Sequence, residues 1–226
     1  MKKHRVIAID GPAGSGKSTT AKLLASRLGF KYLDTGAMYR CVALVALEKG
    51  IDLSNEEAVG DLAAGFDIDF SGDLDDFRVF LDGRDVTLAI RSSRVDATVS
   101  QVSAYKSVRL KMVAMQRKFA ARGDIVAEGR DMATVVFPDA DLKIYLVADL
   151  MTRAIRRCRQ LEGFGLQTTI EQQLASLSSR DLFDSERANS PLRKAPDAVE
   201  LDTSGMSINE QVQRVYELSC ERLGLE

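Results

Sequence analysis

The sequence predicts an α/β fold in which a parallel sheet of five strands carries helices on both faces. Two observations lead to this prediction. Short apolar segments recur along the chain, and longer segments with helical spacing of their apolar residues separate them. A glycine-rich stretch lies directly between the first apolar segment and the first helical one. Ligands of such sheets bind beyond the carboxyl ends of the strands, so functional residues are expected there.

The composition is that of one folded domain. The chain has 226 residues, 45% of them hydrophobic, and a formal net charge of -2. This charge gives no basis for broad binding to nucleic acid or acidic membrane, and no apolar run reaches membrane-spanning length. Cys41, Cys158 and Cys220 form neither a zinc pattern nor a disulfide framework. We expect one domain over residues 1–226, acting as a cytoplasmic monomer.

The N-terminal part predicts two strand–helix units. Val6–Asp10 is a short apolar run that ends in an acid, which is typical of a buried strand. In Lys17–Leu28 the apolar residues recur on one helical face, and a glycine follows. Phe30–Leu33 predicts the second strand, and Met38–Lys49 predicts a well-buried helix that is again followed by glycine.

The next segment departs from this alternation. Ser54 and Glu57 have the spacing of a capping box and predict a helix start. Residues 66–88 alternate apolar and polar side chains around Asp82-Gly83, a hairpin turn signal, and therefore predict a small antiparallel insert. Ser93–Arg122 then predicts helix.

The C-terminal half returns to strand and helix. Asp124–Glu128, Leu142–Ala148 and Ala198–Leu201 are apolar and predict the remaining strands. Leu150–Leu161 predicts a helix between the last two of them. Capping pairs predict two further helix starts: Thr168 with Glu171, and Ser207 with Glu210.

Residues 11–18, GPAGSGKS, match the pattern G-x-x-x-x-G-K-[ST] between the first strand and the first helix. There, a glycine-rich loop presents its N–H groups to an anion at the positive end of the helix. We expect Lys17 to bind the β- and γ-phosphates of a nucleotide and Ser18 to contact Mg²⁺. A glycine-rich turn is the alternative. The residues predicted to bind ATP are Gly11, Pro12, Ala13, Gly14, Ser15, Gly16, Lys17, Ser18 and Thr19.

This motif alone does not define a reaction, because GTP switches, ATP-driven motors and small-molecule kinases share it. The sequence contains no Asn-Lys-x-Asp guanine signature, which argues against a GTPase. The one histidine, His4, precedes the first strand, so a serine- or cysteine-based mechanism has no base. Chemistry on this chain must use acids, cations and backbone dipoles.

Further charged residues follow the predicted strands or share one helix. They lie in YLDTGAMYR at 32–40, AEGRDMATVVFPDA at 127–140 and RDLFDSERANSPL at 180–192. Glu128 ends a strand, where an acid can hold Mg²⁺ through water, and Arg130 and Asp131 follow it. Arg130 and Asp131 alone could be a structural ion pair, and the third segment a solvated helix face.

Taken together, these segments resemble bacterial cytidylate kinases over nearly the whole chain. The resemblance rests on DGPAGSGKST, DTGAMYR, GRDM with TVVFPDA, KIYL, RD with DSERA, and a late DT. It implies a P-loop NTPase-type fold with a small antiparallel β insert and a helical lid. It also implies that ATP, with Mg²⁺, phosphorylates CMP or dCMP.

The resemblance assigns residues position by position. Its acceptor site comprises Thr35, Arg109 and Asp131 around the cytosine, Arg40, Arg130 and Arg187 around the phosphate, and Ser100, Arg180 and Asp184 at the sugar. The nucleoside monophosphate would bind an insert at about 63–100, and a lid would span about 151–168. Two positions depart from the family pattern: Glu128 replaces a frequent aspartate, and Ala133 a common glycine.

Asp131 has a chemical reason to select cytosine. Cytosine presents an amino donor where uracil has a carbonyl. A carboxylate accepts from the amino group and repels the carbonyl, and a buried mismatch of this kind discriminates strongly. We therefore predict that Asp131 reads the base.

Arg153, Arg156 and Arg157 share one face of the helix predicted around residues 150–160. A surface helix with spare charge is one explanation. The other is the lid of nucleoside monophosphate kinases, which this segment resembles, with the two glycines of EGFGLQ at its tip. Arginines of a lid stabilise charge on the transferring phosphoryl group. The predicted catalytic residues are Lys17, Arg130, Arg153 and Arg157.

The sequence thus predicts the reaction ATP + (d)CMP → ADP + (d)CDP, without a covalent enzyme intermediate. Two alternatives stay open. One is a kinase of the same build for another acceptor, such as UMP, AMP or a metabolite hydroxyl. The other is an ATP-dependent switch or binding module. The expected partners are small nucleotides, with neither nucleic acid nor membrane.

Overall fold

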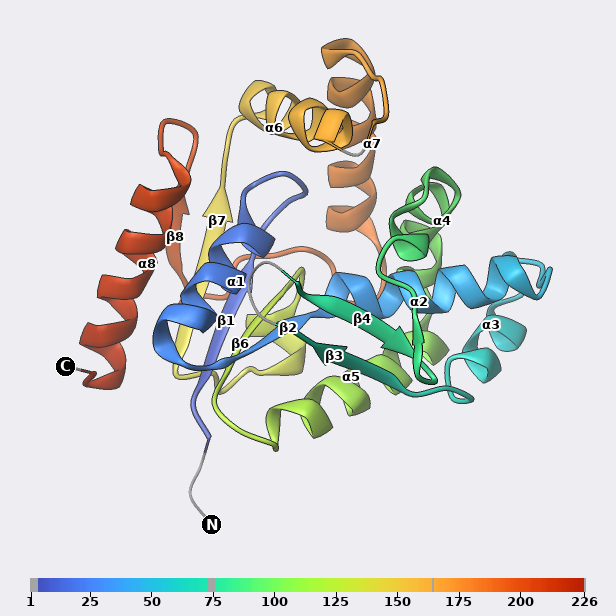
Figure 1. The fold of residues 1–226 in the computed structure, drawn as a ribbon, viewed down its shortest axis with the longest axis horizontal. Coiled ribbons are helices and arrows are strands. Elements are labelled where there is room, and N and C mark those ends of the chain that lie inside the picture. Colours follow the sequence, from blue (N-terminus) through green and yellow to red (C-terminus); the bar gives the residue numbers. More distant parts are fainter. Residues whose placement is uncertain (1–3, 73–75, 164, 226) are drawn as a thin grey trace.

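The computed structural model describes residues 4–72, 76–163 and 165–225. Within these ranges, the main sheet has five parallel strands in the order β2-β6-β1-β7-β8 (Figure 1). The strands are β1 Val6–Asp10, β2 Lys31–Asp34, β6 Ile125–Gly129, β7 Leu142–Val147 and β8 Val199–Asp202. The predicted parallel α/β sheet is confirmed, with strand ends that differ from prediction by one residue at most.

Helices connect these strands. They are α1 Lys17–Leu28, α2 Thr35–Glu48, α3 Glu56–Leu62, α4 Ser93–Ala104, α5 Lys106–Ala120, α6 Leu150–Gly163, α7 Ile170–Glu186 and α8 Ile208–Leu223, with short turns η1 at Ala89–Arg91 and η2, a π-helical turn, at Met132–Val136. Among the described residues, no helix combines the length and apolarity needed to cross a membrane.

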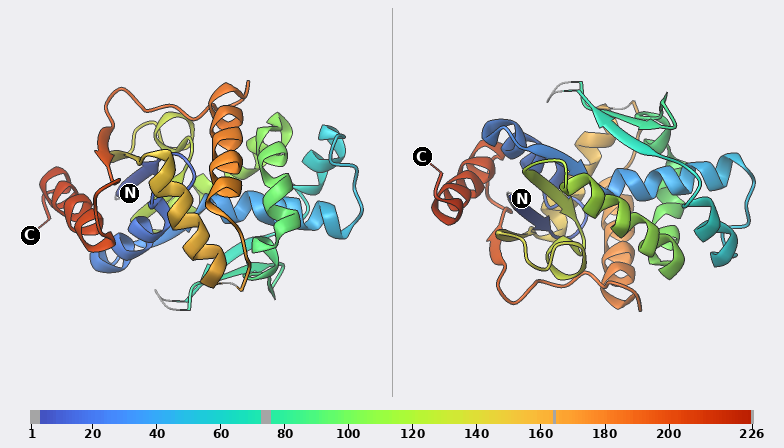
Figure 2. Two further views of the ribbon diagram at one scale, coloured as in Figure 1. Left: turned by 90° about the horizontal axis from the view of Figure 1, so that it is seen from above. Right: turned by 90° about the horizontal axis from the view of Figure 1, so that it is seen from below.

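The central strand β1 packs on both of its faces. Side chains alternate along a strand, so Ile7 and Ile9 point one way and Ala8 the other. The two isoleucines join a cluster with Leu24 of α1 and Val215 of α8, whereas Ala8 joins the cluster that contains α2 and α5. In Figure 2 the strands are seen nearly end-on, with α8 and α2 on opposite sides of them. This two-sided burial explains the continuous apolar run that predicted the strand.

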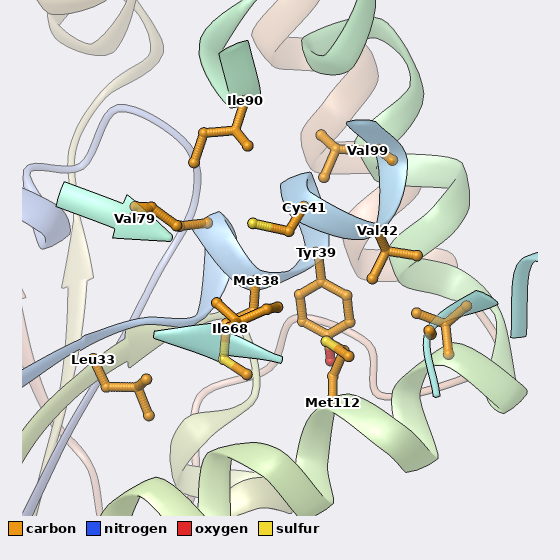
Figure 3. Packing of buried hydrophobic residues seen from close by; sticks show 14 of the residues in the cluster. Leu33, Met38, Tyr39, Cys41, Val42, Ile68, Val79, Ile90, Val99 and Met112 are labelled. Carbon is orange, nitrogen blue, oxygen red and sulfur yellow. The ribbon is translucent and has the colours of Figure 1, made fainter. Parts of the chain in front are cut away.

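The predicted insert is a small antiparallel sheet of strands β3 Ile68–Ser71, β4 Arg78–Leu81 and β5 Arg84–Asp85. Asp82 and Gly83 form the predicted turn with φ of 49° and 80°, as a tight hairpin requires. Figure 3 shows Ile68 and Val79 of this sheet beside Met38 and Cys41 of α2. Residues 73–75 of the insert lie outside the described part of the chain.

The helical segment predicted over 93–122 consists of two helices that meet at Tyr105. Tyr105 is extended, with ψ of 127°, and its hydroxyl donates a hydrogen bond to the carbonyl of Leu53. The break leaves the carbonyl of Ser103 to accept from Arg109 at 3.1 Å. Periodicity did not reveal the break, because apolar spacing continues through it.

Two predicted helix caps are displaced by one residue. Asp52 accepts both the N–H and the hydroxyl of Ser54, so Asn55 caps α3 in its place. Thr169 and Gln172, and not Thr168 and Glu171, form the capping box of α7.

Other helix ends follow local hydrogen bonding. Helix α2 begins at Thr35, three residues before the predicted start, because Asp34 caps it by accepting from the N–H of Ala37 at 2.8 Å. The predicted box of Ser207 and Glu210 is present, and Gly224 ends α8 in the left-handed conformation.

The carboxyl ends of β1, β2 and β6 meet at one edge of the sheet. Asp34 and Glu128 are paired neighbours there, and the glycine loop follows β1 at the same edge. Helices α6 and α7 stand over this edge (Figure 1). The predicted functional segments are therefore brought together as the fold class requires.

Candidate active site

A cleft of about 1510 Å³ opens at this edge of the sheet. It is bounded by the glycine loop, the small insert sheet and helices α4, α6 and α7. A smaller cavity of about 80 Å³ adjoins it. The two share Gly36, Arg40, Glu128, Arg130 and Arg180 as lining residues.

The glycine loop has a backbone that only glycine can adopt at two key positions. A Cβ on Gly11 would lie 2.1 Å from the carbonyl oxygen of Leu146 on the neighbouring strand. Gly16 caps α1 with φ of 93°, and a Cβ there would lie 2.6 Å from Oε1 of Gln211. The loop therefore passes close to β7 and α8 while the start of α1 faces the cleft. Such a helix start is an anion-binding geometry.

Lys17 lies in the same loop and is buried. Its ammonium donates a hydrogen bond to the carbonyl of Pro12 at 2.7 Å. Burial, followed by the positive charge of Arg130, lowers the pKa of Lys17 to about 7. The nearby carboxylates do not offset burial and the charge of Arg130. The phosphates of a bound nucleotide would supply the negative charge that stabilises the ammonium form of Lys17.

Asp34 and Glu128 bring two carboxylates to adjacent strand ends, and Ser18 lines the same cleft. The hydroxyl of Tyr32 donates to Oε1 of Glu128 at 3.1 Å. Burial, followed by the negative charge of Glu128, raises the pKa of Asp34. One buried and one half-buried carboxylate with this mutual repulsion, together with a hydroxyl, are a donor set that suits a hard divalent cation.

The smaller cavity gathers eight of the nine residues predicted to bind the acceptor. They are Thr35, Arg40, Arg109, Arg130, Asp131, Arg180, Asp184 and Arg187. Ser100 is not among the described residues that line either cavity, although its neighbours Val99 and Ser103 line the smaller one. The hydroxyl of Thr35 donates to the carbonyl of Glu128 at 2.6 Å.

Arg109 and Asp131 form a buried ion pair in this cavity. Arg109 is further held by the hydroxyl of Ser190 at 2.9 Å and lies over the ring of Tyr39, 5.4 Å from its centre. Tyr39 itself extends from α2 toward Met112 of α5 (Figure 3). The guanidinium is therefore fixed from several sides, and it fixes the carboxylate in turn.

Asp10 positions the segment that follows Asp131. Its two carboxylate oxygens accept from the N–H groups of Met132 and Ala133, both at 2.8 Å. Asp10 ends β1 immediately before the glycine loop, so one buried side chain joins the two halves of the site. Sequence reasoning noted an acid at the end of the strand but gave it no role.

Asp184 is surrounded by three guanidinium groups. It accepts from Nε of Arg130 at 2.8 Å and lies 4.0 Å from Arg180 and 3.9 Å from Arg187. Within the described part of the chain, Nε of Arg180 and Nη2 of Arg187 are buried and have no hydrogen-bond partner. Burial, followed by the charge of Arg130, lowers the pKa of Arg180 to about 10. The cluster therefore has unused donors and surplus positive charge, as an anion site requires.

The three arginines of α6 have different partners. Arg157 lines the cleft and donates to Asp96 at 2.7 Å. Arg156 lines the cleft and binds the carbonyl of Thr203 at 2.6 Å.

Arg153 lies behind the glycine loop. It binds the carbonyl of Ala13 at 3.2 Å and pairs with Asp181 at 2.7 Å. Arg153 is not among the described residues that line the cleft. The shared face predicted from the spacing thus separates into two arginines that line the cleft, Arg156 and Arg157, and one, Arg153, that holds the glycine loop.

Comparisons with known proteins show which family the chain resembles. A sequence model described as cytidylate kinase matches residues 7–221. A curated cytidylate kinase from Azotobacter vinelandii is 48% identical over 212 residues, covering 93% of this chain and 93% of that protein. One from Desulfitobacterium hafniense is 47% identical, covering 99% and 96%.

Solved structures show the same fold at low identity. The crystal structure of a gluconokinase from Sinorhizobium meliloti has a TM-score of 0.50 and 13% identity, covering 100% of this chain and 97% of that one. At that identity the likeness concerns the fold alone. Because the family match spans nearly the whole sequence, the chain belongs to the cytidylate kinase family.

Proposed function

We propose that this protein transfers the γ-phosphoryl group of ATP to CMP or dCMP, giving ADP and CDP or dCDP. One observation carries the proposal beyond family membership. The buried pair of Arg109 and Asp131 lies in a cavity that also contains the guanidinium cluster, and that cavity adjoins the cleft of the glycine loop. In this proposal, the pair reads the base, the guanidinium cluster binds the acceptor phosphate, and the glycine loop binds the donor nucleotide.

The smaller cavity is the acceptor site in this proposal. Asp131 accepts from the amino group of cytosine, while Arg109 and Thr35 complete the contact with the base. Arg180 and Asp184 bind the sugar, and Arg40, Arg130 and Arg187 bind the phosphate. The unused donors of Arg180 and Arg187 support this division, since both groups are buried without a protein partner among the described residues. Ser100 would bind the sugar only after a local rearrangement.

The larger cleft is the donor site. Residues 11–19 hold the phosphates of ATP, with Lys17 on the β- and γ-phosphates. The insert at about 63–100 takes part in binding the acceptor, and the segment at about 151–168 serves as the lid. Arg157 faces the cleft and is the lid arginine that we assign to the transferring group, whereas Arg153 positions the loop through Ala13.

Mg²⁺ fits the residues at the strand ends. Ser18 would hold it directly, and Glu128 would hold it through water, with Asp34 as an additional carboxylate. Within the described ranges, no three His, Cys, Asp or Glu side chains form a metal site by themselves. Mg²⁺ commonly binds one or two carboxylates and completes its shell with water and substrate phosphates. When bound, it would neutralise charge on the phosphates of ATP.

The protein acts on the reaction by alignment and positive charge. An oxygen of the acceptor phosphate attacks the γ-phosphorus, a new O–P bond forms, and the bond to the β-phosphate oxygen breaks, so that ADP leaves. Lys17, Arg130 and Arg157 stabilise the charge on the equatorial oxygens of the moving group. No side chain becomes covalently modified in this sequence.

For the setting of the reaction we propose a cytoplasmic monomer that binds small nucleotides and neither nucleic acid nor membrane. The formal net charge of -2 supports this, because it gives no broad attraction to polyanions. The three widely spaced cysteines suit a reducing compartment.

An acceptor panel tests the proposal. Release of ADP from Mg-ATP is measured with CMP, dCMP, UMP or AMP, and the product is identified by phosphorus NMR. We expect CMP and dCMP to give nucleoside diphosphates at kcat/KM at least about tenfold above UMP and AMP. A preference for UMP or AMP would assign another acceptor, and no turnover with any monophosphate would favour an ATP-dependent binding module.

A further inference from the structure

Asp96 on α4 faces guanidinium groups from three other helices. Its Oδ1 accepts from Nη2 of Arg40 on α2 at 2.5 Å, and its Oδ2 accepts from Nη2 of Arg157 on α6 at 2.7 Å. Nη1 of Arg180 on α7 lies 3.7 Å from Oδ1. One carboxylate therefore joins the acceptor side of the cleft to its lid side.

The carboxyl of Asp96 is ionised in this setting. Burial raises its pKa, but the attraction of Arg40 and Arg157 outweighs burial and holds the pKa below its usual value. Three positive groups and one negative group leave a surplus of positive charge, so a stronger anion can compete for the same donors.

Both terminal nitrogens of Arg40 donate hydrogen bonds to the protein. Its Nη1 donates to the carbonyl of Ile90 at 3.2 Å, and its Nη2 donates to Asp96. A phosphate that binds Nη2 of Arg40 from the side that Asp96 now occupies must therefore displace the carboxylate. Asp96 can move aside, because 31% of its side chain is exposed and it lines the open cleft.

We propose that Asp96 is an internal counter-anion of the acceptor site: it pairs with Arg40, Arg157 and Arg180 in the empty protein, and the phosphate of CMP displaces it from Arg40, which also releases the other two guanidinium groups. The inference rests on the proposed function, which places that phosphate at Arg40. A phosphate dianion carries more charge than a carboxylate and binds guanidinium groups bidentately, so it wins the exchange. Asp96 accordingly weakens CMP binding, and it keeps Arg157 engaged until the acceptor arrives. It is a positioning residue.

The test compares CMP with cytidine, which lacks the phosphate. Titration calorimetry measures the Kd of both ligands for the wild type and for Asp96→Asn. We expect the variant to bind CMP about five- to tenfold more tightly, because the competing charge is gone. Cytidine should bind both proteins equally. A general change in folding or rigidity would alter both ligands together, so the ratio of the two Kd values isolates the phosphate.

A matched control removes another ion pair between α2 and the insert. Glu48 holds Arg84 with two hydrogen bonds, at 3.1 and 2.7 Å, and neither residue lines the cleft. Glu48→Gln should leave both Kd values unchanged. Asp96→Ser also removes the charge, and it provides the same comparison if Asp96→Asn does not fold.

The outcomes separate the two proposals. Equal or weaker CMP binding by the charge-removing variants, or a parallel change for cytidine, would overturn the role of Asp96 while the proposed function stands. A wild-type protein that binds no CMP would overturn the proposed function, and the role of Asp96 with it.

Discussion

Asp131 is a buried carboxylate whose direct charge partner is Arg109, and both groups lie in the small cavity. A carboxylate in this position accepts from an amino group and repels a carbonyl, so it favours cytosine over uracil. Its fixed geometry matters as much as its charge, because Arg109 is itself held by Ser103, Ser190 and the ring of Tyr39.

Asp131→Ala should abolish the preference for CMP over UMP. We expect kcat/KM for CMP to fall by about a hundredfold or more, with a much smaller effect on UMP. The acceptor assay with purified variants measures both values. Asp139→Ala, which changes an exposed acid in the following loop, is the control. An unchanged ratio of CMP to UMP activity would show that Asp131 does not read the base.

Lys17 should take up a proton when ATP binds. Its pKa is lowered to about 7 in the empty protein, so at pH 8 the amine is largely neutral. The phosphates favour the ammonium form and raise the pKa above 8, and a proton is then bound from solution. Titration calorimetry in buffers of different ionisation enthalpy should show uptake at pH 8 and much less at pH 6. Lys17→Arg should show no proton uptake from this position at either pH, since arginine stays protonated. If the variant takes up as many protons as the wild type, Lys17 is not the group that binds them.

Asp10 should make stability depend on pH in a direction unusual for an acid. Burial raises its pKa from 3.8 to about 6, despite the two N–H groups that favour the ionised form. The folded protein therefore holds the proton more tightly than the unfolded chain, and this contribution to stability is complete below pH 3.8 and lost as the pH rises through 6. The difference corresponds to about 3 kcal/mol.

Asp10→Asn tests this, because it removes the titration and also one of the two acceptors for Met132 and Ala133. The wild type should exceed the variant in unfolding free energy by a larger margin at pH 4 than at pH 7. Urea denaturation at both pH values gives the two margins. A margin that is constant, or that grows toward pH 7, would contradict the buried, protonated state.

At the scale of elements, helix α6 combines two functions that its sequence does not separate. Arg157 points into the cleft, whereas Arg153 reaches the carbonyl of Ala13 and pairs with Asp181 of α7. Equal helical spacing predicted one shared face for both. Their partners come from segments far away in the sequence, and only the fold determines which guanidinium meets which segment.

Arg157→Ala should lower kcat by about a hundredfold or more while the KM for CMP changes little, because its charge acts on the transferring group. Arg153→Ala should instead lower the melting temperature and raise the KM for ATP, since the loop loses a support. Steady-state kinetics and thermal unfolding separate the two patterns. Arg214→Ala, on the exposed face of α8, is the control. A rise in KM alone for Arg157→Ala would exclude the catalytic role.

Local chemistry explains which elements the sequence predicts well. The helix Lys17–Leu28 is observed at the predicted residues because Gly16 and Gly29 determine its two ends. The hairpin at Asp82-Gly83 is present because Gly83 adopts the positive φ that the turn requires. The break at Tyr105 and the shift of a cap from Ser54 to Asn55 were missed. Both depend on hydrogen bonds that apolar periodicity does not register: Tyr105 donates to the carbonyl of Leu53, and Ser54 donates to the carboxylate of Asp52.

At the scale of the whole molecule, the parallel sheet makes the site possible. Strands β1, β2 and β6 end at one edge, so Asp10, Asp34 and Glu128 converge although they are far apart in the chain. The fold class and this edge could be predicted from alternation and from the glycine loop. The pairing of Asp96 with Arg40 and Arg157 could not, because nothing in the segment around Asp96 distinguishes it from a solvated helix.

The most direct test of the central claim is a crystal structure with CMP and a non-hydrolysable ATP analogue bound together. The proposed function predicts cytosine against Arg109 and Asp131, and the CMP phosphate among Arg40, Arg130 and Arg187. The γ-phosphate should lie between Lys17 and that phosphate, in line for transfer. Cytosine bound outside the small cavity, or a triphosphate away from residues 11–19, would contradict the assignment of acceptor and donor sites.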